Sequence, residues 1–222
     1  MFNHCGARYP VQASAVVGLL VLMLPGISMA GDWETDYRSK ELRVQTRAVE
    51  GSGIEEIRSY FDVPWSPEQA AEVVFSTDAQ RKYLVGVKEV KVLGETTTAK
   101  GNRVKTVYQR MEYPAIDDRE VVLKFTMGSK DSKSGTVWTI RFKRIDAKVS
   151  KRSGVVRIEH LTGSWDIKPN PSGSGARMVY RCHVEIGGNV PDFVVNSGQV
   201  DNLRQMMTTL HEEMHKKHGS PK

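Results

Sequence analysis

Apolar and polar residues alternate along most of this chain, which indicates strands. Leu42, Val44 and Thr46 alternate with polar side chains across residues 41–50, and a Gly-Ser-Gly turn then leads to a second strand at 54–63. This period of two is typical of a half-buried strand. Six further segments show strand patterns, at residues 85–93, 103–111, 119–127, 136–145, 155–167 and 176–186.

Two regions have helical features instead. Ser66 is a suitable N-cap for a helix that begins at Pro67, and residues 78–83 add a second short helical turn. After Pro191, apolar side chains recur at steps of three and four as far as Met214, which predicts a closing helix of about 24 residues and about 36 Å. Its apolar stripe has to lie across the sheet. The predicted fold class is therefore α+β, a meandering antiparallel sheet with helices near its ends.

The first thirty residues have the features of a secretory signal peptide. An apolar run at residues 13–24 is followed by small residues up to Ala30, the expected site of cleavage. The run is too short to span a bilayer. We therefore expect a signal peptide at 1–30, one domain at 31–218 and a short tail at 219–222, with the mature protein periplasmic or secreted.

The charge of the chain limits the kinds of partner molecule that are expected. The chain has 32 basic and 26 acidic residues and a net charge of +6. It contains no motif of a nucleic-acid module, so we expect no nucleic-acid partner. The densest basic stretch, residues 141–152, fits either a solvated strand and loop or a patch for transient contact with an anionic membrane. Cys182 is the only cysteine after the expected signal peptide, and we expect a buried, inert thiol.

Four segments resemble signatures of START domains, the lipid-transfer domains named after the steroidogenic acute regulatory protein. They are "VKEVKVLGE" at 87–95, "YPAIDDREVV" at 113–122, "VVRIEHLTGSW" at 155–165 and "EIGGNVPDFVVN" at 185–196. The segments follow the family's order, and the resemblance covers about residues 40–215. It implies a helix-grip (START-like) fold, in which a curved antiparallel sheet wraps around the long C-terminal helix. It also implies an internal apolar cavity for one lipid-like molecule.

The resemblance also indicates the kind of ligand. Family members mostly bind or carry lipids, sterols or polyketide-like molecules, and a few relatives on the same scaffold are cyclases or aromatases. Some sterol-binding members hold the ligand's hydroxyl with a buried acid–base pair, whereas the corresponding region here has Thr106 and Phe125. We therefore expect a more apolar and less specifically held ligand, a lipid or other hydrophobic small molecule. Whether the protein also transfers it stays open.

Period two on the strands, together with the helix stripe, selects the residues expected to contact the ligand. Arg157 shares a strand face with Leu161, so it is the candidate for a polar contact with a ligand head group. A structural ion pair is the alternative for Arg157. The expected ligand-binding residues are Leu123, Phe125, Trp138, Ile140, Phe142, Arg157, Met178, Tyr180, Phe193, Val200, Leu203, Met207 and Leu210.

Two short polar or flexible segments have alternative explanations. The charged run at residues 117–120 is either a polar site at the cavity mouth or a corner stabilised by salt bridges. Gly187 and Gly188 fit a sharp turn from strand to helix, because glycine tolerates positive φ.

Residues 211–215 match the pattern H-E-x-x-H, which binds zinc in metalloproteases. At about 100° per residue the two histidines flank the apolar stripe, and Glu212 faces solvent. A catalytic zinc also needs a third protein ligand and an open coordination position, and only seven residues follow His215.

We therefore expect a monomer without a metal, a cofactor or an enzymatic activity. One alternative is a cyclase or aromatase on this scaffold, which would place ionisable residues on the cavity wall. The other is a protein whose core is filled by side chains and that acts through its basic surface.

Overall fold

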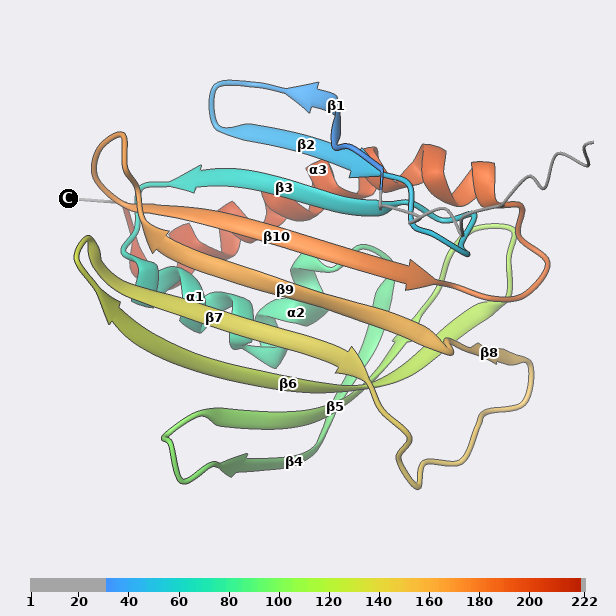
Figure 1. Ribbon diagram of the computed structural model, residues 1–222. Coiled ribbons are helices and arrows are strands. Elements are labelled where there is room, and N and C mark those ends of the chain that lie inside the picture. The colour runs from blue at the N-terminus through green and yellow to red at the C-terminus, as the bar shows by residue number, and fades with distance from the viewer. Residues whose placement is uncertain (1–30, 221–222) are drawn as a thin grey trace, which may run out of the picture.

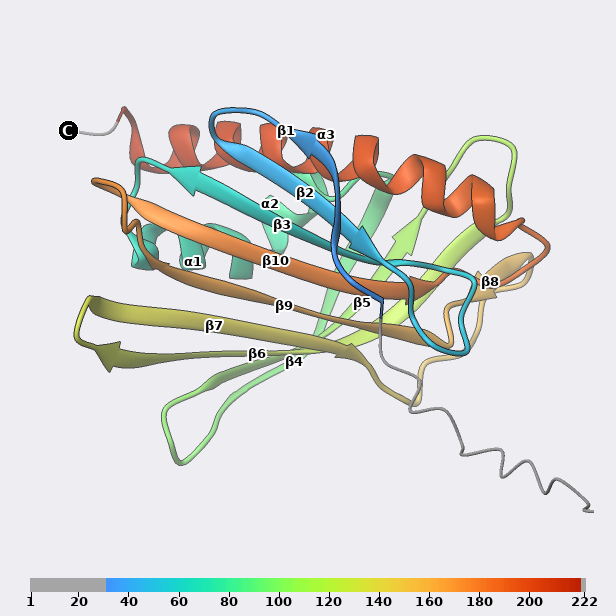
Figure 2. The same ribbon diagram turned by 45° about the horizontal axis from the view of Figure 1, so that its top comes forward.

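The computed structural model describes residues 31–220 as one curved sheet that wraps around a long C-terminal helix (Figure 1, Figure 2). The expected signal peptide at 1–30 and the last two residues of the expected tail lie outside the described residues. The sheet has ten strands in the order β1-β2-β3-β10-β9-β7-β6-β5-β4, with β8 paired to β6. The elements are β1 Glu34–Arg38, β2 Leu42–Arg47, β3 Glu56–Val63, α1 Pro67–Phe75, α2 Thr77–Tyr83, β4 Val87–Thr97, β5 Arg103–Met111, β6 Asp118–Ser132, β7 Gly135–Arg144, β8 Val155–Arg157, β9 His160–Pro169, β10 Ala176–Glu185 and α3 Asp192–His218.

The architecture confirms the predicted α+β helix-grip fold. All strand pairs along the main path are antiparallel, and the short pair of β6 and β8 is parallel. The helices lie on the concave side of the sheet, where α1 contacts β7, β9 and β10 while α3 contacts β3. The other side of the sheet faces solvent, and its strands pass in front of α3 in Figure 1.

The predicted start of α1 is confirmed in detail. The Ser66 side chain accepts a hydrogen bond from the Gln69 amide at 3.2 Å, and the Gln69 side chain accepts one from the Ser66 amide at 3.0 Å. This capping box satisfies two backbone donors that the helix itself leaves free. Proline at the first helical position adds a backbone already set for the helix.

The final helix is longer than expected, and its first turn differs from the prediction. It spans 27 residues, and its buried side chains are Leu203, Met206, Met207, Leu210 and Met214. Phe193 was expected in the buried stripe but is 72% exposed, so that assignment is wrong. The start of α3 extends past the part of the sheet that would cover it, whereas the second half lies over buried strand residues.

Asn196 interrupts the stripe because it fastens the helix to the sheet. Its side-chain amide donates to the Gly53 carbonyl at 2.9 Å, and its side-chain oxygen accepts from the Glu55 amide at 3.1 Å. Both partners lie in the turn between β2 and β3. The polar position therefore sets where the helix begins relative to the sheet.

Two strand predictions need correction. The expected single strand at 155–167 is divided into β8 and β9, because the chain leaves β6 and joins β7. The Ile158 amide donates to the Glu120 carbonyl at 2.9 Å at this crossing. β1 was not predicted. It forms a short antiparallel pair with β2, and the register of this pair shifts once. Within residues 31–220, no helix is both long and apolar enough to span a membrane.

We expect Leu210→Ala to lower the free energy of unfolding by about 2–5 kcal/mol, since it removes a fully buried side chain. Phe193→Ala is the matched control on the same helix and should change it by about 0.5 kcal/mol or less. Chemical denaturation of both variants measures the difference. Equal losses would contradict the exposed position of Phe193.

Candidate ligand-binding site

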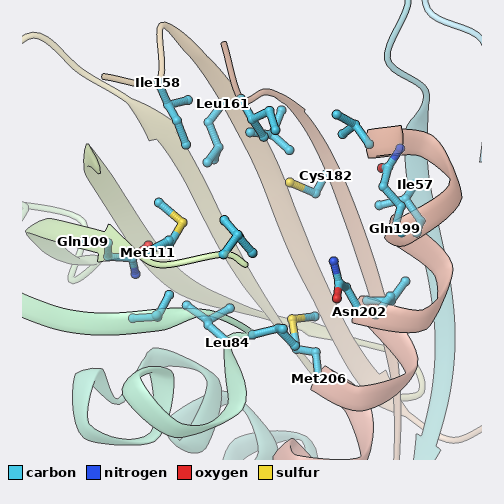
Figure 3. A pocket seen from close by; sticks show the side chains of 18 of the residues that line it. Ile57, Leu84, Gln109, Met111, Ile158, Leu161, Cys182, Gln199, Asn202 and Met206 are labelled. Carbon is cyan, nitrogen blue, oxygen red and sulfur yellow. The ribbon is translucent and has the colours of Figure 1, made fainter. Parts of the chain in front are cut away.

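An apolar cavity of about 390 Å³ lies between the concave face of the sheet and the first half of α3 (Figure 3). Its walls come from strands β3, β5, β6, β7, β9 and β10, from the α2–β4 connection and from the β5–β6 loop. Met111 and Leu161 extend into it from the sheet side, while Asn202 and Met206 extend from α3. The volume lies within the range of about 300–1,000 Å³ found for small-molecule sites.

The cavity lining has no ionisable acid or base of the common kinds. Among the described residues that line it, none is an aspartate, glutamate, lysine, arginine or histidine. Its polar groups include the side-chain amides of Gln80, Gln109, Gln199 and Asn202. An ionised ligand group inside would lose its hydration without gaining a counter-charge. The wall is therefore suited to an uncharged molecule.

Two of these amides form a buried pair in the wall of the cavity. The Gln109 side chain donates to the Gln80 side-chain oxygen at 3.2 Å, and the Gln80 amide donates to the Val74 carbonyl at 3.2 Å. Both side chains are thus held in fixed positions. Such a pair can offer a hydrogen bond to a neutral polar group of a ligand without introducing charge.

The remaining titratable groups of the wall stay neutral near neutral pH. Burial raises the pKa of the Cys182 thiol to about 11. Burial also raises the pKa of the Tyr83, Tyr113 and Tyr180 hydroxyls above their ordinary value. A general acid, base or nucleophile works best when its pKa lies near the working pH. These groups are therefore poorly suited to catalysis, and the expectation of a buried Cys182 is confirmed.

The cavity reaches the surface between the β5–β6 loop and the start of α3. Pro114 and Val194 line the cavity and are also exposed. Val194 is 46% exposed, and its neighbour Phe193, in the first turn of α3, is 72% exposed. These apolar side chains form what we call the apolar rim of the mouth, defined by Pro114, Phe193 and Val194.

Five of the expected ligand-binding residues line this cavity. The strand residues lie at the positions that period two selects, and Leu203 comes from α3. Their contact with a ligand stays a prediction. The five are Leu123, Phe125, Phe142, Tyr180 and Leu203.

The other apolar candidates lie in the core or at the surface, because the cavity occupies only one end of the sheet. At the other end, α1 packs against β7, β9 and β10. Phe193 is on the rim, not on the wall. The residues that belong to the core or border it are Trp138, Ile140, Met178, Val200, Met207 and Leu210.

Several residues of the wall were missed, for two different reasons. Leu161, Trp165, Cys182 and Val184 follow the same alternation as the residues that were selected, so the sequence pattern contained them. Gly198, Gln199 and Asn202 on α3 are small or polar, so a search for an apolar stripe passes over them. A helix face that borders open space does not have to be apolar throughout.

Arg157 forms the structural ion pair that was the alternative to a ligand contact. Its Nε and Nη2 atoms donate to Glu120 Oε1 at 2.9 and 2.7 Å, and the Tyr108 hydroxyl donates to Glu120 Oε2 at 2.9 Å. Glu120 is fully buried. Burial alone would raise the pKa of its carboxyl, but the hydrogen bonds from Arg157 and Tyr108 outweigh it and lower that pKa below its ordinary value.

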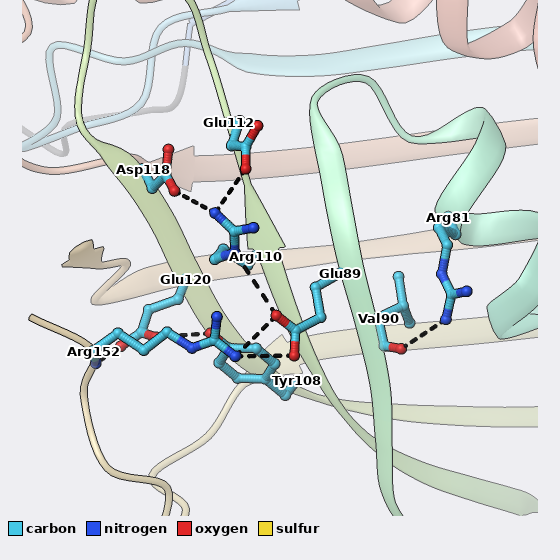
Figure 4. A network of polar contacts seen from close by, with 9 residues as sticks. All are labelled: Arg81, Glu89, Val90, Tyr108, Arg110, Glu112, Asp118, Glu120 and Arg152. Atoms are coloured by element: carbon cyan, nitrogen blue, oxygen red, sulfur yellow. Dashed lines mark hydrogen bonds and ion pairs between the residues drawn. The ribbon is translucent and has the colours of Figure 1, made fainter. Parts of the chain in front are cut away.

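This pair belongs to a larger network of charges on the outer side of the sheet (Figure 4). Arg152 pairs with Glu89 at 2.9 Å, and Arg110 bonds to Asp118 and pairs with Glu112 at 2.7 Å. The network ties β4, β5 and β6 to the loop before β8. The charged run at 117–120 is therefore a corner stabilised by salt bridges, away from the cavity wall.

Arg119, in the same run, holds the turn that precedes α3. The side chain is 1% exposed. It donates to the carbonyls of Gly187 at 2.9 Å and Asp117. Gly187 and Gly188 have φ of 66° and 74°, and a Cβ on Gly188 would lie 2.9 Å from Arg119 Nη2. The glycines thus serve the sharp turn that was predicted and also leave room for the guanidinium.

The H-E-x-x-H residues lie at the far end of α3, away from the mouth. The His211 ring stacks edge-on against Trp65, with centroids 4.8 Å apart, and Glu213 pairs with Lys82 at 2.9 Å. Glu212 is exposed. In residues 31–220 no three histidine, cysteine or acidic side chains gather as a metal site would require. The motif is part of the contact between α3 and the β3–α1 region.

In this protein a curved antiparallel sheet wraps around a long helix, and a cavity without charged side chains lies between them. The arrangement of sheet and helix places the protein in the class of helix-grip proteins. Residues 21–216 match the model of the START domain, and the chain belongs to the START domain family. The resemblance inferred from the four segments is thereby confirmed.

Solved structures show the same fold. A STAR-related lipid transfer protein from Xanthomonas axonopodis is 23% identical, with a TM-score of 0.71 over 82% of this chain and 98% of that one. Human StAR-related lipid transfer protein 5 is 16% identical, with a TM-score of 0.69 over 84% of this chain and 88% of that one. Human STARD10 is 19% identical, with a TM-score of 0.65 over 84% and 76%. No protein of curated function matches the sequence.

We expect Glu120→Ala to lower the free energy of unfolding by about 3–5 kcal/mol near neutral pH, because Arg157 would stay largely buried without its counter-charge. The pKa of Glu120 is lowered in the folded protein, so its contribution is complete above the ordinary value of 4.5 and is lost as the pH falls through the folded value. The gap between wild type and variant should therefore narrow in acid.

Urea denaturation over a series of pH values measures this gap. Glu159→Ala is the control, since Glu159 pairs with Arg144 but its side chain is 74% exposed, and it should cost about 1 kcal/mol or less. A gap that stays constant from neutral pH to well below 4.5 would show that the Glu120 carboxylate does not carry the effect.

Proposed function

We propose that this protein is a lipid-binding carrier that holds one uncharged, apolar small molecule in its internal cavity. The observation that carries the proposal is the cavity of about 390 Å³ without a charged side chain in its wall. Affinity arises from removing apolar surface from water, at about 25 cal/mol per Å². The four side-chain amides can form hydrogen bonds with one or two neutral polar groups on the ligand. Membership of the START family supports the same function.

The chemistry of the wall favours binding over catalysis. A cyclase or aromatase needs groups that can exchange protons with the ligand near the working pH. The tyrosine hydroxyls and the Cys182 thiol of the wall all have raised pKa values, so they hold their protons. We therefore propose a protein without enzymatic activity and without a cofactor.

We further propose that the carrier is exported and acts outside the cytoplasm as a monomer. The support is the pattern of residues 1–30, with a short apolar run followed by small residues up to Ala30. A soluble carrier between membranes is useful where apolar molecules must cross an aqueous compartment. The apolar rim supports transfer, because exposed apolar side chains beside an opening can enter the interface of a bilayer.

Filling the cavity from Gly198 gives a direct test of binding. Gly198 lines the cavity on α3, and a Cβ there would have the Asn202 side chain as its nearest neighbour at 3.8 Å. Gly198→Trp should therefore place its ring in the cavity without disturbing the core. Replacing a glycine inside a helix also stabilises it, by about 0.5–1 kcal/mol when the replacement is alanine.

We expect wild-type protein purified from its own cell envelope to carry one apolar molecule in native mass spectrometry, and Gly198→Trp to carry at least tenfold less. Ser197→Trp, at the exposed neighbouring position, is the control and should keep the ligand. An empty wild-type protein that also takes up no fluorescent apolar probe would overturn the proposal. Equal loading of both variants would place the ligand elsewhere.

Transfer can be tested separately at the apolar rim. Phe193→Asp adds a charge at an exposed position, so the fold and the bound ligand should be unaffected. The rate of ligand transfer between vesicles should fall about tenfold or more, since a charge resists entry into the bilayer interface. A transfer assay with a fluorescent ligand measures this rate, and an unchanged rate would show that the rim is not the membrane contact.

A further inference from the structure

The side of the sheet opposite the helices carries a concentration of positive charge. Directly opposite residues in neighbouring strands share a face, so the register identifies which side chains lie together. Arg58 lies opposite Arg181, Arg181 opposite Ser164, and Ser164 opposite Arg141, which runs across β3, β10, β9 and β7. We define the outer cationic face by nine basic residues that share this face on six strands: Arg43, Arg47, Arg58, Arg177, Arg181, Lys168, Arg141, Lys143 and Lys124.

The carboxylates on these strand faces, which include the exposed Glu185 on β10, are fewer than the cations. Glu56 pairs with Arg47, Asp62 pairs with Arg177, and Asp166 pairs with Arg141. The remaining six cations have no acidic partner within the part of the chain that the structure describes. They are Arg43, Arg58, Arg181, Lys124, Lys143 and Lys168.

The register brings like charges together on this face. Arg58 lies directly opposite Arg181, and Lys124 lies directly opposite Lys143. Such pairs destabilise a sheet. The pKa of Arg58 lies below its ordinary value, through burial first and then through neighbouring guanidinium groups.

Aromatic side chains hold two of the arginines flat against the sheet. The Arg58 guanidinium lies 3.9 Å from the centre of the Trp33 ring, and that of Arg43 lies 4.2 Å from the centre of the Tyr60 ring. The Nε atoms of both arginines are buried and have no hydrogen-bond partner among residues 31–220. The stacking restricts these two guanidinium groups, and contact with an external anion is left to the exposed cations Lys124, Lys143, Lys168 and Arg181.

The composition of the face indicates the kind of partner. Interfaces between proteins have an apolar, charge-depleted centre. The large apolar residues that are exposed in the described chain are Val92, Leu93, Phe193 and Val194, and none lies on these six strands. Six strands at a spacing of about 4.8 Å make a face roughly 24 Å wide. A broad face on which cations outnumber carboxylates suits an extended anionic surface.

We propose that the outer cationic face docks on a bilayer that contains anionic phospholipids. The inference rests on the proposed carrier function, because a carrier of apolar molecules has to meet bilayers. Each lysine or arginine near such a surface strengthens partitioning about fivefold. The apolar rim belongs to the mouth and not to this face, so attachment to the membrane and exchange of the ligand use different parts of the molecule.

The test is sedimentation of the purified protein with vesicles of phosphatidylcholine alone, or with equal parts of phosphatidylglycerol. The face variant replaces four exposed cations of the face by glutamine: Lys124→Gln, Lys143→Gln, Lys168→Gln and Arg181→Gln. The control variant makes the same change of net charge elsewhere on the exposed surface: Lys88→Gln, Lys100→Gln, Lys216→Gln and Lys217→Gln.

We expect wild type and control to bind the anionic vesicles and to be released by salt, and the face variant to bind at least tenfold more weakly. The face variant should be as stable as wild type or more so, because like charges have been removed. Binding to neutral vesicles as well, or an equal loss in the control variant, would overturn the proposal. So would binding of soluble polyglutamate without binding of anionic vesicles.

The two proposals fail in different ways. Ligand content by native mass spectrometry is measured on the same preparations, and the face variant should keep its ligand. If the protein carries a ligand but does not bind anionic vesicles, the proposed docking surface is wrong and the proposed carrier function still stands. If the protein binds these vesicles through the face but carries no ligand, the proposed carrier function is wrong instead.

Discussion

The hydrogen bonds that the Arg119 guanidinium donates to the turn before α3 are the constraint on which the rest of this structure depends. They join the start of β6 to the carbonyl of Gly187, so they determine where the final helix leaves the sheet. Asn196 adds a second fixed point, to the turn between β2 and β3. Leu210 and Met214 then bury the far end of the helix. With both ends held, the first half of α3 can stand away from the sheet without collapsing onto it, and the cavity occupies that space.

The same sheet separates two kinds of chemistry by the alternation of its residues. Side chains that point inward line a cavity without charge, and those that point outward carry arginines and lysines in excess. The buried pair of Glu120 and Arg157 lies on the outer side, so its charges do not reach the ligand space. An apolar molecule inside and an anionic surface outside are therefore compatible with one another. The fold itself keeps the two apart.

The sequence predicted the architecture well because long elements carry repeated signals. Eight segments were predicted from period two, and they cover nine of the ten strands described, although the break between β8 and β9 was missed. That break depends on β6 and β7 as partners, and no local pattern records it. β1 was missed because a five-residue strand with mostly exposed residues has almost no alternation.

The candidate site was predicted less completely than the fold. Leu123, Phe125, Phe142, Tyr180 and Leu203 line the cavity as selected, while Ile140 and Met178 point the same way but belong to the packed core. Alternation identifies the inward face of a strand but not which inward residues border open space. Phe193 shows a different error. It has the helical spacing of the buried stripe, but it is exposed because its turn of the helix extends past the sheet.

The sequence by itself determined the strand faces, the capped start of α1, the glycine turn before α3 and the family. These follow from neighbouring residues or from motifs of fixed spacing. Only the tertiary structure decided where the cavity ends, that Arg157 binds Glu120, that His211 stacks on Trp65, and that cations from six strands meet on one face. Each of these joins residues far apart in the chain. Their meeting depends on register and on the path of the helix, which no local pattern encodes.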